Sequence, residues 1–326
     1  MITHITMQMH ATNYLDERRR LGFDLRSVGY SVNSFACYVD SLNLEGPLTI
    51  EVMAAWAQCD KGNSGNPKTW ARRLGKLRPF TRYLQQFEPL TEVPNDFTFG
   101  QTGQRPAPHI YIEQEVIELL AAARSLGPSP GLRGATYETL FGLMASTGLR
   151  VSEAVNLLET DVDLKAGMLT IRMTKFAKSR YVPMHPSVVN VLRRYQSLRN
   201  LHIEFTEEMP FFMGTRGRRK GHCLGLRQVH RVFAGLRDQL KWLNRGTNDA
   251  PRIHDLRHTF IVNRVMLWHS QGVNVDQQML ALSTYVGHAK VTNTYWYLSG
   301  VPQLMTVVAN KFEAFTQMQG GEPCLK

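Results

Sequence analysis

Cysteine is scarce in this chain, and long apolar runs are lacking. The four cysteines, Cys37, Cys59, Cys223 and Cys324, are scattered over 326 residues without close pairs. This spacing argues against a disulfide framework and against a cysteine-based zinc site, so a reducing cytoplasmic compartment is expected. No run of about 18 apolar residues occurs, which argues against a membrane-spanning helix. The N-terminal residues also lack the apolar stretch of a secretory signal peptide.

Acidic residues are outnumbered by basic ones. The chain has 27 Asp and Glu against 38 Lys and Arg, a formal net charge of +11. Such an excess favours a polyanionic partner, because cationic side chains release the counterions condensed on it. The hydrophobic share of 43% is ordinary for a globular protein, and the length allows two domains, each with its own core.

The hydrophobic pattern divides the chain into two predicted domains. Residues 1–91 have apolar positions recurring at three and four, as in SVNSFACYVDSLNL and LTIEVMAAWAQC, which predicts helices. Residues 92–108 are rich in Pro, Gly and Thr and form the predicted linker. Residues 109–315 are predicted to be a second, mostly helical domain, and 316–326 a flexible tail. Within 167–184 the period changes to two, which predicts a β-hairpin. The expected fold class is therefore mainly α with a small antiparallel β-sheet.

Two basic clusters are candidate contacts for a polyanion. A charge run of this kind is usually a solvated face, but proximity to a site for phosphodiester chemistry would make phosphate contact the better interpretation. The first cluster lies in WARRLGKLRPFTRYLQQF, where Pro79 is expected to kink or shorten the helix. The second begins the stretch from Phe211 to Arg245, in which Asp238 is the one acid. The candidate DNA-binding residues are Arg72, Arg73, Lys76, Arg78, Arg82, Arg216, Arg218, Arg219 and Lys220.

Four short strings carry residues suited to phosphodiester chemistry. They are TGLRVSE (147–153), TKFAKSRYVP (174–183), HDLRHTF (254–260) and VGHAKVTNTYWY (286–297). Guanidinium groups donate paired hydrogen bonds to phosphate oxygens, and imidazole, amine and phenol groups move protons or attack phosphorus. The candidate catalytic residues are Arg150, Lys175, His254, Arg257, His288 and Tyr297, with Glu153 placed to orient Arg150.

Individual residues of this set also have ordinary structural interpretations. Taken alone, either arginine would be interpreted as a partner in a structural salt bridge. His254 and His258 have the i, i+4 spacing of a zinc pair, but a third ligand other than the distant His288 is not obvious. His258 is more simply interpreted as a buried, hydrogen-bonded helix residue. We therefore expect neither a metal nor another cofactor.

Together and in this order, the strings resemble the catalytic half of tyrosine site-specific recombinases, the integrase family. In that family the nucleophile follows the second histidine by nine residues, which selects Tyr297 over Tyr295. The catalytic lysine precedes a proline by eight, which selects Lys175 over Lys178, its rival, by reference to Pro183. The resemblance also implies that residues 1–91 are a core DNA-binding domain and 109–315 an integrase-type catalytic domain, and that the two close around duplex DNA as a clamp.

The resemblance implies a reaction and an assembly. The tyrosine attacks the scissile phosphate, a 3′-phosphotyrosine forms, and a 5′-hydroxyl from a partner duplex resolves it without metal or ATP. Four protomers act on two DNA sites. Residues 306–315 have helical apolar spacing, and in many relatives a helix here docks on a neighbouring protomer; a helix folded back on its own core is the alternative. A mobile-element integrase or transposon recombinase is the expected role. The alternatives are a chromosome-dimer-resolving recombinase, a type IB topoisomerase and a DNA-binding regulator without catalytic activity.

Overall fold

The computed structural model describes residues 6–44, 46–59, 65–100, 105–127, 131–172, 179–202, 206, 208–215, 220–300 and 304–305. The chain divides into two compact units, Met1–Arg105 and Pro106–Lys326, each with its own hydrophobic core. This division falls within the predicted linker 92–108. Phe99 packs against Trp70 of the first unit, with ring centroids 5.5 Å apart, and the Ala107 carbonyl accepts from the Thr247 amide of the second at 2.9 Å. Phe99 and Ala107 of the predicted linker are therefore each packed against a unit.

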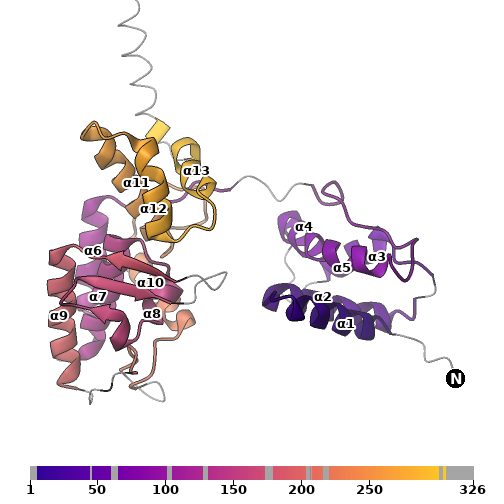
Figure 1. The fold of residues 1–326 in the computed structure, drawn as a ribbon, viewed down its shortest axis with the longest axis horizontal. Helices are drawn as coiled ribbons and strands as arrows, with labels where there is room; N and C mark the ends of the chain where they lie inside the picture. The colour runs from indigo at the N-terminus through magenta and orange to yellow at the C-terminus, as the bar shows by residue number, and fades with distance from the viewer. Residues whose placement is uncertain are drawn as a thin grey trace, which may run out of the picture. The chain divides into compact units, whose positions relative to one another are not determined.

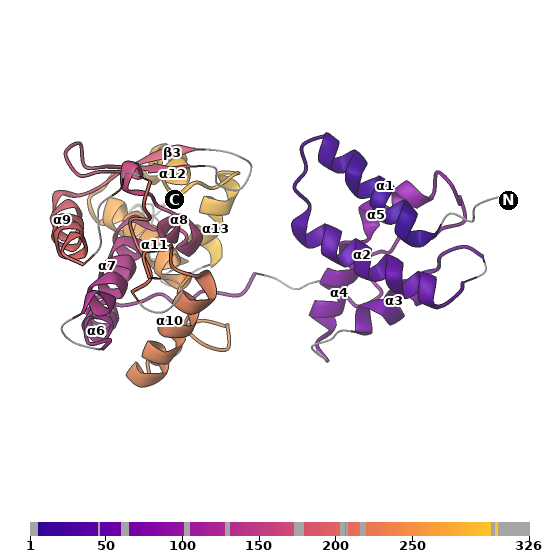
Figure 2. The ribbon, with the colours of Figure 1, turned by 90° about the horizontal axis from the view of Figure 1, so that it is seen from below.

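The described part of the first unit is helical, as predicted. Its helices are α1 (Met7–Arg20), α2 (Arg26–Ser41), α3 (Ile50–Gln58), α4 (Pro67–Gly75) and α5 (Arg78–Leu84). The side chains of Thr6, Thr49 and Asn66 accept hydrogen bonds from first-turn amides and so cap α1, α3 and α4. Figure 2 shows α2 between α1 and the α3–α4 pair.

Pro79 has the predicted effect on the basic segment. Helix α4 ends at Gly75 and α5 begins at Arg78, so the proline occupies the first turn of α5. In that turn its missing N–H costs no helical hydrogen bond, whereas inside a continuous helix it would break one. The buried Leu74, Leu77 and Phe80 keep both short helices on the same core.

The second unit contains the remaining helices and a small sheet. In chain order its described elements are α6 (Glu113–Arg124), α7 (Leu132–Thr147), α8 (Val151–Val155), the 3-10 helix η1 (Glu159–Asp161), β1 (Val162–Asp163), β2 (Met168–Ile171), β3 (Arg180–Pro183), α9 (Pro186–Asn200), α10 (Leu226–Leu240), α11 (Asp255–Ser270), α12 (Val275–Val286) and α13 (Thr292–Gly300). Helices α6, α7, α9 and α10 pack with the sheet on one core, and α11, α12 and α13 form a second cluster at one end of the unit (Figure 1).

The predicted hairpin is present as β2 and β3. The sheet has the order β1-β2-β3 and is antiparallel, with Leu169 opposite Val182 and Ile171 opposite Arg180. Leu169, Ile171 and Val182 are buried, so this face of the hairpin covers the core. The fold class, mainly α with a small antiparallel sheet, is confirmed.

Among the residues described, no helix is long and apolar enough to cross a membrane.

Candidate active site

Two helix ends bring distant strings of the sequence together. Helix α7 ends at Thr147, and Gly148 continues in the left-handed conformation with φ +65°. Glycine adopts this conformation without a steric penalty, which frees its carbonyl from the helix. That carbonyl accepts a hydrogen bond from Nη1 of Arg257 at 2.7 Å. The TGLR and HDLRH strings therefore meet at this helix end.

Gly287 has the same function for the other arginine. It caps α12 with φ +71°, and its carbonyl accepts a hydrogen bond from Nη2 of Arg150 at 2.7 Å. A Cβ at this position would lie 2.6 Å from Nη1 of Arg180, so the glycine also makes room for a guanidinium. The glycines of TGLR and VGH thus each hold one of the two predicted phosphate-binding arginines.

Glu153 holds Arg150 in position from the protein side. Arg150 is the N-cap of α8, and Glu153 lies one turn later. Its carboxylate accepts from the Arg150 amide at 3.0 Å and from Nη1 at 2.6 Å. Since 30% of the Arg150 side chain is exposed against 6% for Glu153, the guanidinium extends towards solvent while its anchor is buried.

Arg180 is a site residue that the sequence did not predict. From β3 it donates to both carboxylate oxygens of Glu153, at 3.1 and 2.9 Å, and to the Tyr285 carbonyl at 2.8 Å. The hairpin register held a signal for it, because Arg180 lies opposite the buried Ile171 and thus on the inward face. A cation on an inward strand position requires a buried acid.

The charges in this part of the site are strongly coupled. Burial alone would raise the pKa of Glu153, but hydrogen bonds and charge from Arg180 and Arg150 lower it to about 2. Burial and the nearby charge of Arg150 lower the pKa of Arg257 to about 9. Both groups remain ionised at neutral pH, and the arginines present more positive charge than Glu153 neutralises. An anion would relieve that excess.

Arg257 has an unused hydrogen-bond donor. Its side chain is 1% exposed, and although Nη1 binds Gly148, the buried Nη2 has no hydrogen-bond partner among the described residues. A buried guanidinium nitrogen without an acceptor costs free energy. A phosphate oxygen at this position would supply the acceptor.

His254 lies one turn before Arg257, at the N-cap of α11. Burial, followed by the positive charge of Arg257, lowers the pKa of His254 to about 4, so the imidazole is neutral at pH 7. Its ring packs edge-on against that of His258, with centroids 4.8 Å apart. His254 can therefore donate or accept one hydrogen bond in the site without adding charge.

Tyr297 lies against this group of histidines. The tyrosine comes from α13 and is fully buried, and its hydroxyl is hydrogen-bonded to Nδ1 of His258 at 2.5 Å. Its ring lies parallel to that of His288, with centroids 6.4 Å apart, while Nδ1 of His288 is bonded to Thr294 Oγ1 at 2.7 Å. The prediction that His258 is a buried, hydrogen-bonded helix residue is confirmed, and its partner is the proposed nucleophile.

Tyr295 lies in a different environment from Tyr297. The cost of desolvation, and then the charge and hydrogen bonding of Asp276, raise the pKa of the Tyr295 phenol, which therefore points to the start of α12. This divergence follows from helical geometry, in which residues two apart face opposite sides.

Several predicted residues lie outside the part of the chain that the structure describes. These are Lys175 and its rival Lys178, the cations Arg216, Arg218 and Arg219, and the segments 306–315 and 316–326. Lys220 is described and exposed, and it forms an isolated β-bridge with Gly214.

The first basic cluster separates into two kinds of cation. Arg73 donates to the Trp56 and Cys59 carbonyls at the end of α3, and Arg78 donates to the Pro94 carbonyl at 2.9 Å and pairs with Asp96. Lys76 contacts Ser27 Oγ at 3.0 Å. These contacts are within the first unit. Arg72 and Arg82 are exposed.

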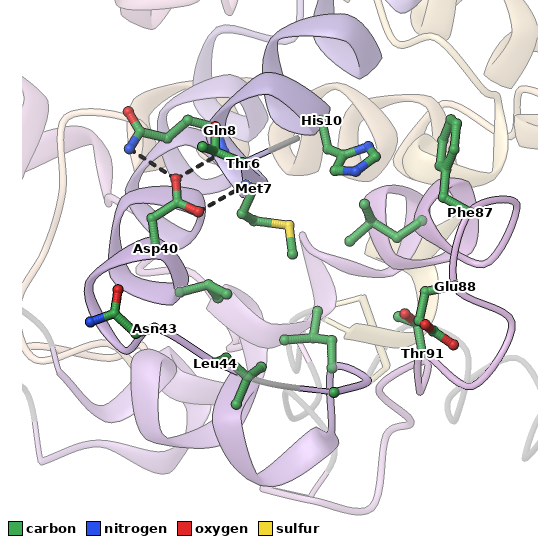
Figure 3. Close-up of a pocket in the computed structure, with 14 residues that line it drawn as sticks. Thr6, Met7, Gln8, His10, Asp40, Asn43, Leu44, Phe87, Glu88 and Thr91 are labelled. Atoms are coloured by element: carbon green, nitrogen blue, oxygen red, sulfur yellow. Dashed lines mark hydrogen bonds between the residues drawn. The ribbon is translucent and has the colours of Figure 1, made fainter. Parts of the chain in front are cut away.

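A groove of about 610 Å³ in the first unit is a poor alternative site. It lies between α1, α2 and the end of α5, and Asp40 in its wall accepts from the amides of Met7 and Gln8 (Figure 3). Its other charged lining residue is Glu88, so the groove does not suit a phosphate. In the described ranges no group of three or more His, Cys, Asp or Glu could hold a metal ion.

Comparisons with known proteins agree with this geometry. The model of the phage integrase family matches residues 111–301. The chain is 36% identical over 311 residues to y4rB of Sinorhizobium fredii, named as a candidate integrase/recombinase, and the match covers 94% of this chain and 97% of y4rB. It is 27% identical over 242 residues to the tyrosine recombinase XerC of Rhizobium meliloti, covering 74% and 69% of the two chains.

Solved structures share the fold at low sequence identity. The integrase of transposon Tn1549, in complex with transposon right-end DNA, matches with a TM-score of 0.64 and 17% identity over 93% of this chain and 99% of that one. The XerH recombinase bound to its difH substrate matches with a TM-score of 0.58 and 19% identity, over 89% and 80%. Since the family model covers more than half of the chain and a 36%-identical relative spans nearly all of it, the chain belongs to the phage integrase family of tyrosine recombinases, the enzymes of site-specific DNA recombination.

Proposed function

We propose that this recombinase cuts and rejoins DNA through a 3′-phosphotyrosine on Tyr297. The observation that supports the proposal best is the buried Nη2 of Arg257, which has no acceptor in the described chain and lies in the same site as Arg150 and the Tyr297 phenol. A scissile phosphate fits there, held by Arg150 and Arg257, with His254 and His288 as additional hydrogen-bond partners.

The proposed roles follow from the charge that develops in the reaction. As Tyr297 attacks, negative charge grows on the non-bridging oxygens, and two fixed guanidinium groups stabilise it. The departing 5′-oxygen needs a proton, which Lys175 supplies by the family pattern. Glu153 positions Arg150, and Arg180 holds Glu153. The bond energy stays in the phosphotyrosine, so rejoining needs no nucleotide cofactor.

The proposal extends to the DNA and the assembly. The two units act as a clamp on duplex DNA, with residues 1–91 as the core-binding domain and 109–315 as the catalytic domain. Four protomers act on two DNA sites. Integration or excision of a mobile element is the proposed role, supported by the higher identity to the candidate integrase/recombinase of Sinorhizobium fredii than to XerC of Rhizobium meliloti.

Covalent capture tests the chemistry. Nicked suicide duplexes, tiled across the DNA that flanks the chain's own gene, are incubated with the protein in EDTA. We expect a protein–DNA adduct on at least one duplex. Arg150→Ala and Arg257→Ala should each slow adduct formation by about 10²–10³-fold, the range for a removed oxyanion donor, while DNA affinity falls much less.

The same experiment has outcomes that contradict the proposal. Absence of an adduct on every duplex, with DNA binding intact, would support a regulator without catalytic activity. Adducts and supercoil relaxation on any plasmid would support a topoisomerase. Adducts confined to a chromosomal dimer-resolution site would replace the mobile-element role.

A further inference from the structure

His258 contacts the Tyr297 phenol, although His258 has no role in the proposed reaction described above. His258 follows His254 by one helical turn on α11, and only 3% of it is exposed. Its Nδ1 lies 2.5 Å from the Tyr297 hydroxyl. A proton acceptor must lie within hydrogen-bond reach of the proton it removes, and this pair meets that requirement before any DNA is bound.

The direction of the hydrogen bond follows from the acidity of the two groups. A phenol O–H is a stronger donor than the N–H of a neutral imidazole, and an imidazole nitrogen is the stronger acceptor. The favoured arrangement therefore has the Tyr297 O–H donating to Nδ1, with the histidine neutral. Burial of both groups strengthens this bond, because water does not compete for either partner.

His288 and His254 have contacts that suit them to other roles than accepting the Tyr297 proton. His288 presents the face of its ring to the Tyr297 ring, and its Nδ1 is engaged by Thr294. His254 packs edge-on against His258 and lies one turn from Arg257, which suits a phosphate contact. Its pKa, lowered to about 4 by burial and then by Arg257, also makes it a weak base at neutral pH.

We propose that His258 is a catalytic residue that receives the proton of Tyr297 during cleavage, leaving His254 to bind the phosphate. This inference rests on the proposed function and names a member of the site that the sequence reasoning treated as structural. In the step, the Oη–H bond breaks as its proton moves to Nδ1, the Oη–P bond forms and the P–O5′ bond breaks. Lys175 gives its proton to O5′. In rejoining, His258 returns the proton to the departing phenol.

The test separates proton acceptance from simple positioning. The variants are His258→Ala and His258→Asn, since Oδ1 of asparagine can accept a hydrogen bond near the position of Nδ1 without acting as a base. Lys175→Ala is the comparison variant. Each is assayed on a capturing duplex whose scissile phosphate has either oxygen or sulfur at the bridging 5′ position, because a thiolate departs without a proton.

We expect both His258 variants to form the adduct about 10²-fold or more slowly than the wild type on both duplexes, within the range for general acid–base catalysis. Lys175→Ala should be slow on the oxygen duplex and recover on the sulfur duplex. Unfolding midpoints and DNA affinity show which variants fold. If His258→Ala does not fold, the adduct rates of His258→Asn decide whether His258 accepts the proton.

Two results would overturn the inference. Wild-type rates for His258→Asn would make the residue a positioning group only. Recovery of either His258 variant on the sulfur duplex would assign it to the leaving group. Failure of the wild type to form any adduct is a different result, because it removes the proposed function itself.

Discussion

The carboxylate of Glu153 accepts hydrogen bonds from two guanidinium groups while only 6% of its side chain is exposed. Its pKa of about 2 lies below the ordinary value of 4.5, so the folded state favours the ionised form. The stability this provides is complete above pH 4.5 and is lost as the pH falls towards 2. Replacement of the charge should therefore destabilise the protein at neutral pH and have little effect in acid.

Glu153→Gln is expected to lower the free energy of unfolding by about 3 kcal/mol at pH 7, because the guanidinium groups of Arg150 and Arg180 lose their buried counterion. The difference from the wild type should shrink between pH 4.5 and 2. Urea denaturation at a series of pH values measures this. Glu138→Gln is the control, because its partner Arg124 is 73% exposed and the loss should stay below about 1 kcal/mol. Equal effects of the two variants would contradict the anchoring role of Glu153.

Residue spacing predicted part of the site but not its internal contacts. Counting from His288 selected Tyr297, and the structure places that phenol beside His258, whereas the Tyr295 phenol interacts with Asp276. The roles of Arg180 and His258 were missed because both depend on partners far away in the sequence. A charge on an inward strand position and a histidine at i+4 were visible signals, but each has a common structural explanation.

At the scale of the elements, the C-terminal ends of two helices position the two arginines of the site. Gly148 and Gly287 both have positive φ, and their carbonyls bind Arg257 and Arg150. A Cβ on Gly148 would lie 2.6 Å from the Phe260 ring, and one on Gly287 would lie 2.6 Å from Arg180. Gly272, after α11, has φ +69° and no atom within 4 Å of its added Cβ. Gly272 therefore has the same left-handed backbone as Gly148 and Gly287, but a side chain added there would meet no neighbouring atom.

Gly272→Ala, Gly148→Ala and Gly287→Ala therefore form a matched series. Each should lose about 1 kcal/mol of stability from the left-handed backbone alone. Gly148→Ala should lose more, because the partly buried ring of Phe260 must move. Gly287→Ala shifts Arg180 and should slow adduct formation by about 10²-fold through misplacement of the arginines. Gly272→Ala should cut at the wild-type rate. Unfolding curves and adduct rates would contradict this account if all three behaved alike.

The elements were predicted best where one local rule dominated. Period-two alternation and turn residues gave the hairpin, and Pro79 gave the break between α4 and α5. The partial packing of residues 92–108 was not predicted. Composition alone does not show that Phe99 finds Trp70 or that Ala107 binds Thr247, because these are long-range contacts.

At the scale of the whole molecule, the net charge of +11 favours DNA, but the cations differ in what they do. Arg73 and Arg78 hold carbonyls and Asp96 within the first unit, whereas Arg72 and Arg82 are exposed. The sequence predicted the cluster and the division into two domains. It did not separate structural from surface cations, since that depends on packing within the unit.

The Arg72→Ala/Arg82→Ala double variant should bind DNA more weakly, with a slope of log affinity against log salt reduced by about 1.8, and should unfold like the wild type. Arg73→Ala should instead lower stability, because the end of α3 loses its donor and its cation–π contact with Trp56, 4.5 Å away. Salt-dependent binding and denaturation curves measure both. An unchanged salt slope in the double variant would remove Arg72 and Arg82 from the DNA surface.

The central claim concerns which atom attacks DNA, and peptide mapping of the captured adduct tests it most directly. The adduct formed in EDTA is digested with protease and nuclease, and mass spectrometry identifies the tyrosine that carries the nucleotide. We predict that it is Tyr297, that Tyr297→Phe forms no adduct, and that Tyr295→Phe still does. A nucleotide on Tyr295, or an adduct that persists in Tyr297→Phe, would contradict the account.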